Sequence, residues 1–247
     1  EPKIISENDL EDLGEGDASW HPYSNVFEPS LGAYSAELVI PDNPTSGDFA
    51  GVDSFFDVFF ELDDISSLTY DKKVVDYDSS GWNPLFLLGI DVDNDGILEA
   101  HPLEWESALG FGLPNASLLG DDSFIQCESE TGLSGTDSSF VNVDAYNTFK
   151  CYTPNLAGNN YDSTYQSLNY FQANSVGRVS STSKVAMLKV HLGGNPSTQD
   201  DEIAYVDNVK LNGNLVINDP IISVNNETGI ELHCEDQEPH PTPFENI

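Results

Sequence analysis

The sequence predicts an all-β protein, a jelly roll or β-sandwich with short helical turns and extended arms at both ends. Short segments rich in β-branched and aromatic residues recur along the chain, and Gly, Asn, Asp, Ser or Pro bounds most of them. The candidate helices are few and short. Many strands at near-regular spacing favour two packed sheets over a helical or mixed fold.

The predicted elements follow from hydrophobic periodicity along the chain. In residues 203–211, the larger apolar side chains of Ile203, Tyr205, Val209 and Leu211 lie an even number of residues apart, as on one face of a strand. The helix candidates are residues 7–13 and 103–109. The predicted strands are residues 34–40, 53–62, 84–92, 139–149, 164–172, 185–192 and 203–211, with two more within 220–234.

The two ends differ in composition from the middle of the chain. Residues 1–17 are acidic, and residues 235–247 contain three prolines and little apolar material. No internal repeat of 20–50 residues is evident in the sequence. The sequence therefore predicts an N-terminal arm over 1–17, one β-jelly-roll domain over 18–217, and a C-terminal strand extension and tail over 218–247.

The charge balance is the strongest bulk feature. The 247 residues include 8 Lys and Arg against 43 Asp and Glu, a formal net charge of -35. So few cations exclude nucleic acid and anionic membrane surfaces as partners. Two interpretations of the acidity stay open: a halophilic setting in which salt screens the self-repulsion, or carboxylates that hold divalent cations.

Several features point to export. No stretch approaches the roughly 20 apolar residues of a membrane helix, so no membrane span is expected. The chain begins with Glu1, as a mature protein does after signal removal. Asn115 and Asn226 lie in glycosylation sequons. The expected location is extracellular or on the cell surface.

The three cysteines suggest one disulfide. Cys127 and Cys151 lie at the polar ends of two strand-like segments, 122–128 and 139–152, which can lie side by side. An oxidising compartment then favours a bridge between them. Cys234 is left over, either free or paired with another chain.

The sharpest motif is the aspartate-rich run from residue 91 to residue 99. It resembles the calcium loop of EF-hands and of dockerin and thrombospondin repeats, in which alternate carboxylates converge and a glycine, here Gly96, permits the turn. The resemblance implies Ca²⁺ as the cofactor. The ligands that it implies are the side chains of Asp91, Asp93 and Asp95, the carbonyl of Ile97, and Glu99 directly or through water.

The motif departs from an EF-hand in two ways. Pro102 occupies the position of the bidentate Glu, and Glu104, two residues later, is the substitute ligand if the chain leaves the loop differently. A strand, not a helix, enters the loop. An isolated calcium loop on a β scaffold is therefore predicted.

A second resemblance concerns residues 204–211. They are similar to the last core strand of carbohydrate-binding-module jelly rolls, in which an aspartate commonly helps to bind a structural calcium; this makes Asp207 a second metal residue. Modules of that family bind glycans through exposed aromatic rings. The candidates here are Trp20, Trp82, Trp105, Tyr161, Tyr165 and Tyr170.

Catalytic patterns are incomplete, so the chain is not expected to be an enzyme. Residues 61–65 resemble the Glu-x-Asp-x-Glu strand of a jelly-roll glycosidase family, but Ile65 stands where the second Glu is needed as the acid. The sequence contains neither a Gly-x-Ser-x-Gly elbow nor a His-Glu-x-x-His zinc motif. The five histidines lack metal-ligand spacing, although His233, Cys234 and His240 lie close together.

Three functions remain after these exclusions. The first is a non-catalytic calcium-binding structural subunit that forms a homo-oligomer or homopolymer, a filament, tube or surface layer, by strand exchange between copies. The alternative is a carbohydrate-binding or adhesion module with a glycan ligand. A glycoside hydrolase or lyase rests on fold analogy alone.

Overall fold

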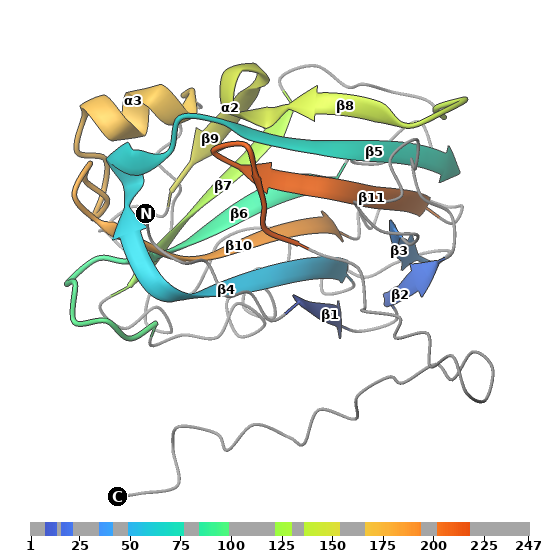
Figure 1. Cartoon of the computed structure of the whole chain (residues 1–247), viewed down its shortest axis with the longest axis horizontal. Helices are drawn as coiled ribbons and strands as arrows, with labels where there is room; N and C mark the ends of the chain where they lie inside the picture. Colours follow the sequence, from blue (N-terminus) through green and yellow to red (C-terminus); the bar gives the residue numbers. More distant parts are fainter. Residues whose placement is uncertain are drawn as a thin grey trace, which may run out of the picture.

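The computed structural model describes residues 8–13, 16–21, 35–41, 49–76, 84–98, 122–129, 136–153, 166–193 and 202–217. These residues form two antiparallel sheets that pack face to face, with short helices at one end (Figure 1). The all-β sandwich predicted from the sequence is confirmed. No helix among the described residues is long and apolar enough to cross a membrane.

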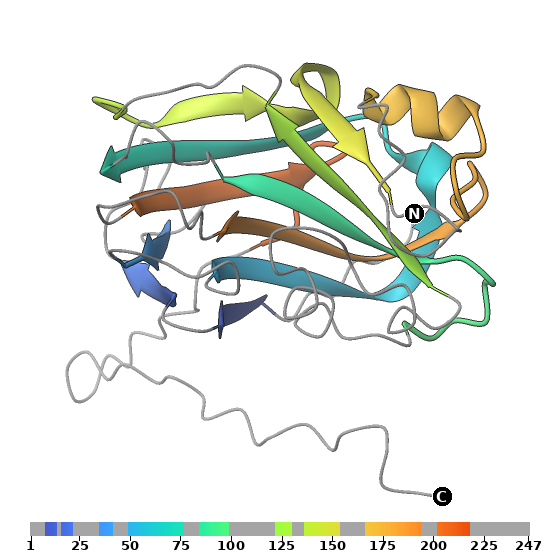
Figure 2. The same cartoon turned by 180° about the vertical axis from the view of Figure 1, so that it is seen from behind.

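Each sheet combines strands that are distant in sequence with a few that follow one another, such as β2 and β3 (Figure 2). Sheet A has the order β1 (Asn8–Leu13), β4 (Phe49–Glu61), β10 (Lys184–Gly193), β6 (Leu85–Asp91), β7 (Ser123–Ser129) and β9 (Phe149–Tyr152). Sheet B has the order β2 (Asp17–His21), β3 (Ser35–Ile40), β11 (Glu202–Leu211), β5 (Leu68–Asp76) and β8 (Val141–Asp144), and β12 (Asn214–Leu215) pairs with β11. The short helices are η1 (Leu62–Asp64), α2 (Ala145–Thr148) and α3 (Leu168–Ala173).

The main core lies between the two sheets. Phe86, Leu88 and Ile90 point into it from β6, and all three are fully buried. The intervening Leu87 belongs to a second apolar cluster with Phe124, Tyr152 and Met187 on the outer face of sheet A. Because β6 is buried on both faces, its sequence is a continuous apolar run and not an alternating one.

Three predicted elements differ from the structure. Residues 8–13, within a predicted helix, form β1, because pairing with β4 satisfies their backbone groups at a sheet edge. Residues 168–173, which overlap the predicted strand 164–172, form α3, where Leu168 and Phe171 bury one helical face. The predicted strand 139–149 is divided into β8, α2 and β9.

Other elements were missed by sequence reasoning or lie outside the described residues. β5 was not predicted, since its alternation of Leu68, Tyr70 and Val74 is interrupted by Lys72. β2 was not predicted either. The candidate helix 103–109 and the candidate strands within 220–234 lie outside the described residues.

The predicted disulfide between Cys127 and Cys151 is present. The two residues face each other directly in the β7–β9 register, with a Cα–Cα distance of 4.0 Å, and both are fully buried. The bridge spans a sequence separation of 24 and fixes the short edge strand β9 to the sheet. Cys234 lies outside the described residues.

The outer face of sheet A also buries charge. Lys189 and Asp53 are register partners on β10 and β4, and both are fully buried. A Cβ at Gly51 would lie 2.8 Å from Cε of Lys189 and 3.0 Å from Cβ of His191, so only glycine fits beneath these side chains. Burial, with a further contribution from the charge of Lys189, lowers the pKa of His191 to about 3.

The β11–β12 turn provides a test of the fold. Asn212 has a φ of 51°, and its Oδ1 accepts hydrogen bonds from the amides of Ser66 (2.7 Å) and Ser67 (3.2 Å). We expect Asn212→Ala to lower the free energy of unfolding by about 2 kcal/mol, because it loses these bonds and strains the backbone. Asn212→Gly relieves the strain and should lose less. Urea denaturation of both variants checks the order, and an equal loss would contradict the role of the positive φ.

Candidate metal centre

The aspartate-rich loop begins where β6 ends. Asp91 is the last residue of that strand and is fully buried. Its Oδ1 accepts a hydrogen bond from the amide of Asn94 (2.6 Å), and its Oδ2 accepts one from the amide of Gly96 (3.0 Å). Asn94 and Gly96 have φ angles of 63° and 88°, in the left-handed region that Asn and Gly adopt most readily. The chain therefore curls around the Asp91 carboxylate.

Two further aspartates continue the turn. Oδ1 of Asp93 accepts from the amide of Asp95 (3.2 Å), and Oδ1 of Asp95 accepts from the amide of Ile97 (2.8 Å). These bonds span two residues and are the turns that Asp side chains commonly form with the backbone. Leu98 then packs with the second apolar cluster and approaches Gly89 of β6, which fixes the exit of the loop on the outer face of sheet A.

Strand pairing brings a third carboxylate to this place. Ile90 pairs with Ser123 in the β6–β7 register, so Asp91 and Asp122 lie one step beyond the ladder on adjacent strands. Asp122 is 1% exposed. One carboxylate oxygen from each of Asp91, Asp93 and Asp122 lies within 4.8 Å of the other two. Three hard oxygen donors that converge in this way can hold a metal ion.

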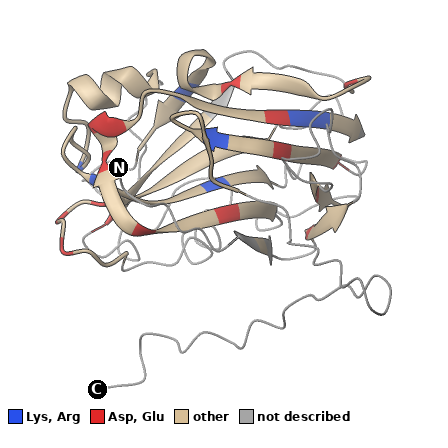
Figure 3. Cartoon of the chain, in the orientation of Figure 1, with Lys and Arg blue, Asp and Glu red and all other residues tan. Residues whose placement is uncertain are grey.

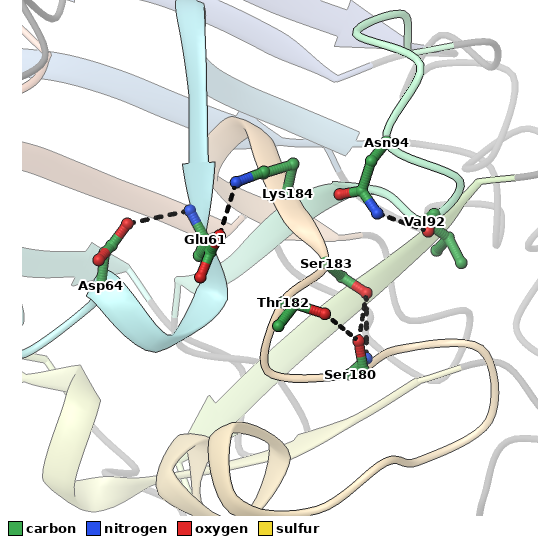
Figure 4. Close-up of polar contacts among 8 residues, drawn as sticks. All are labelled: Glu61, Asp64, Val92, Asn94, Ser180, Thr182, Ser183 and Lys184. Carbon is green, nitrogen blue, oxygen red and sulfur yellow. Dashed lines mark hydrogen bonds and ion pairs between the residues drawn. The ribbon is translucent and has the colours of Figure 1, made fainter.

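The electrostatics of the centre favour a cation. Burial raises the pKa of the Asp91 carboxyl, and the charge of Asp93 raises it further, while the hydrogen bonds from Gly96 and Asn94 act in the opposite direction. Lys184 pairs with Asp91 in the β10–β6 register, but its ammonium donates to Glu61 at 3.0 Å (Figure 4). A divalent ion at the cluster would offset the repulsion among these carboxylates.

Among the described residues, the structure brings together two of the ligands that the motif predicts. It brings Asp91 and Asp93 together, whereas Asp95 is not in the cluster found among the described residues. The prediction that the carbonyl of Ile97 is a ligand stays a prediction. Glu99 and Glu104 lie outside the described residues, as do the sequon residues Asn115 and Asn226.

Sequence reasoning missed Asp122 because it lies far from the loop along the chain. A signal existed: Asp122 immediately precedes an apolar strand-like segment of the same length as β6. If those two segments pair as antiparallel strands, the end of the first lies beside the start of the second.

Asp207, the predicted second metal residue, lies elsewhere, on β11 of sheet B opposite Asp71. Its Oδ1 accepts from the amide of Asn208 at 2.7 Å. The carboxylate of Asp71 accepts from the side-chain amides of Asn142 (2.7 Å) and Asn208 (2.8 Å). Side-chain amides therefore surround the Asp71 carboxylate at this position.

Residues 61–65, which resemble a glycosidase strand, lie where β4 ends and the short helix η1 follows. Glu61 ends β4, and its amide donates to Oδ2 of Asp64 at 3.1 Å in the cap of η1. Asp63 and Asp64 are exposed, and Ile65 is buried. Figure 4 shows this cap beside Lys184, with the 180–183 turn nearby.

The aromatic residues proposed for glycan stacking do not form a platform in the described part of the chain. Trp20 packs in part against the main core, and Tyr170 on α3 is 40% exposed. The other four, Trp82, Trp105, Tyr161 and Tyr165, lie outside the described residues, as do His233 and His240.

No protein-family model matches the chain, and no curated protein matches it significantly.

Proposed function

We propose that the chain is a secreted, non-catalytic, calcium-binding structural subunit that self-assembles into an extracellular filament, tube or surface layer. The observation that carries this proposal is the cluster of Asp91, Asp93 and Asp122, which gathers carboxylate oxygens where β6 ends and β7 begins. Calcium takes six to eight oxygen ligands and suits carboxylates, and backbone carbonyls and water complete its shell.

Calcium at this place would act on the whole sandwich. β6 and β7 are neighbours in sheet A, and β6 contributes to both apolar clusters. An ion that binds both strand ends therefore stabilises the folded chain against an unfolded chain in which the carboxylates are dispersed. A sandwich that calcium stabilises in this way suits a structural subunit outside the cell.

The net charge gives calcium a second role. A chain with a formal charge of -35 repels other copies of itself, and Figure 3 shows acidic residues distributed over the described elements with few basic ones. Divalent ions reduce that repulsion both by site binding and by screening. Assembly is therefore expected to require calcium or high salt.

The test combines binding and imaging. Isothermal titration should detect calcium binding to the wild type, and Asp122→Asn should weaken it at least tenfold. Asp57→Asn removes an equal charge from an exposed position on β4 and serves as the control. Electron microscopy at millimolar calcium should show polymers that disperse with a chelator.

Three results would contradict the proposal. Wild-type protein that binds no calcium would remove the metal centre. Single particles at every calcium and salt concentration would remove the structural subunit. Specific binding on a glycan array, in protein that stays monomeric, would favour the carbohydrate-binding alternative.

A further inference from the structure

The N-terminal strands β1 and β2, here together called the clip, close one side of the sandwich. β1 is the edge strand of sheet A and β2 is the edge strand of sheet B (Figure 1). Leu10, Ala18 and Trp20 of the clip pack against the main core. The clip is thus a small unit that contributes one edge to each sheet and apolar side chains to the space between them.

Among the described residues, strand pairing and apolar packing hold the clip to the sandwich, and a separate peptide can make both kinds of interaction. Asn8 to Leu13 pair in unbroken register with Ser54 to Phe49 on β4, and Asp17 to His21 pair with Val39 to Ser35 on β3. Neither clip strand lies between two other strands among the described residues. Removing the clip would leave the order of all other strands unchanged, as in complexes where a strand is added to a sheet edge.

The connection after the clip is longer than its position requires. β2 and β3 are antiparallel neighbours, and a hairpin between such strands usually needs two to five residues. Here 13 residues, numbered 22–34, join them. At about 3.3 Å per residue such a length of chain can span up to about 43 Å when extended. A connection of this length does not by itself restrict the clip to the strands of its own chain.

The receiving edge presents buried charges of both signs near the acidic clip. Asp9 and Glu11 occupy register positions opposite Asp53 and Gly51 of β4. On the other side of β4, the next residues in line are Lys189 and His191, and the Cε of Lys189 lies over Gly51. In register order Asp53 lies between Asp9 and Lys189, so backbone pairing and apolar packing, and not charge, would hold an incoming strand at this edge.

We propose that the clip is exchanged between copies: β1 and β2 of one subunit occupy the β4 and β3 edges of the next. The partner is a second copy of this chain, and this inference rests on the self-assembly proposed above. Each subunit then gives one clip and receives another, a head-to-tail contact that extends into a filament unless the rotation closes a ring. The receiving edges satisfy their backbone groups in both the closed and the exchanged form.

Ser19 and Glu37 offer a direct test. They are register partners on β2 and β3, and their side-chain oxygens lie 3.4 Å apart. Ser19→Cys and Glu37→Cys are made as two separate variants, each in a Cys234→Ser background, and are mixed in equal amounts before calcium is added. A disulfide between the two positions can then form only between chains. With random mixing, about one contact in four is able to cross-link.

We expect covalent dimers on a non-reducing gel of the assembled mixture, and no more than background dimer in either variant alone. The double variant should give a ladder of covalent oligomers. Assembled particles whose double variant runs only as an internally bridged monomer would overturn the exchange and leave the proposed function intact. Absence of particles under every condition would overturn both.

Discussion

Saturating calcium is expected to raise the free energy of unfolding by about 4 kcal/mol when the free ion exceeds its dissociation constant a thousandfold. The reason is that the cluster of Asp91, Asp93 and Asp122 exists only when β6 and β7 are paired. In the unfolded chain Asp122 is separated from the loop by about 30 residues, so the ion has no cage there. Urea denaturation at several calcium concentrations measures the increment.

Two substitutions in the loop separate the cluster from the sequence motif. Asp93→Asn keeps an Oδ1 that can accept from the Asp95 amide but removes a charge from the cluster. We expect it to weaken calcium binding at least tenfold, a loss of about 1.4 kcal/mol from the increment. Asp95→Asn makes the same change in the same loop and keeps an acceptor for the Ile97 amide, but it lies outside the cluster.

Two outcomes of this comparison would contradict the three-carboxylate cluster. If Asp95→Asn reduced the calcium increment as much as Asp93→Asn, the alternating motif would describe the ligands better than the three-carboxylate cluster. If neither changed it, the ion would bind elsewhere. Asp57→Asn, on β4, controls for the loss of one negative charge from an already acidic chain.

How much of the site the sequence predicted depends on how far apart the interacting residues lie along the chain. Asp91, Asp93 and the turn at Gly96 lie within six residues, and local hydrogen bonds define their geometry. A pattern over such a short range is readable from sequence. The position of Asp122 depends on which strands pair, and hydrophobic periodicity does not specify a pairing.

The same distinction applies to the fold. The apolar runs of β6, β10 and β11 were recognisable because burial dictates their composition. β1 was mistaken for a helix because its acidic sequence is stabilised by its position at a sheet edge and not by its own propensity. The buried pair of Lys189 and Asp53 was not predicted, since charged residues in a strand usually indicate a solvated face.

Acidification is expected to destabilise the chain through His191 by about 3 kcal/mol between pH 6.5 and pH 4. The folded state keeps the imidazole neutral, because burial and the charge of Lys189 lower its pKa to about 3. The unfolded state takes up a proton below the ordinary pKa of 6.5. The unfolded chain therefore binds more protons in this interval, and stability falls as the pH decreases.

His191→Gln isolates this contribution because glutamine does not titrate. Above about pH 8 both proteins are neutral at this position in the folded and the unfolded state, so their difference in stability there contains no protonation of His191 and serves as the internal reference. Between pH 6.5 and pH 4 the wild type should lose stability more steeply than the variant, by up to one proton per molecule in the slope. Chemical denaturation at half-unit pH intervals measures both slopes, and NMR of the His191 ring should show no titration above pH 4. Parallel slopes, or a ring that titrates near pH 6.5, would mean that the outer face of sheet A admits water to His191, in conflict with its burial beside Lys189 and above Gly51.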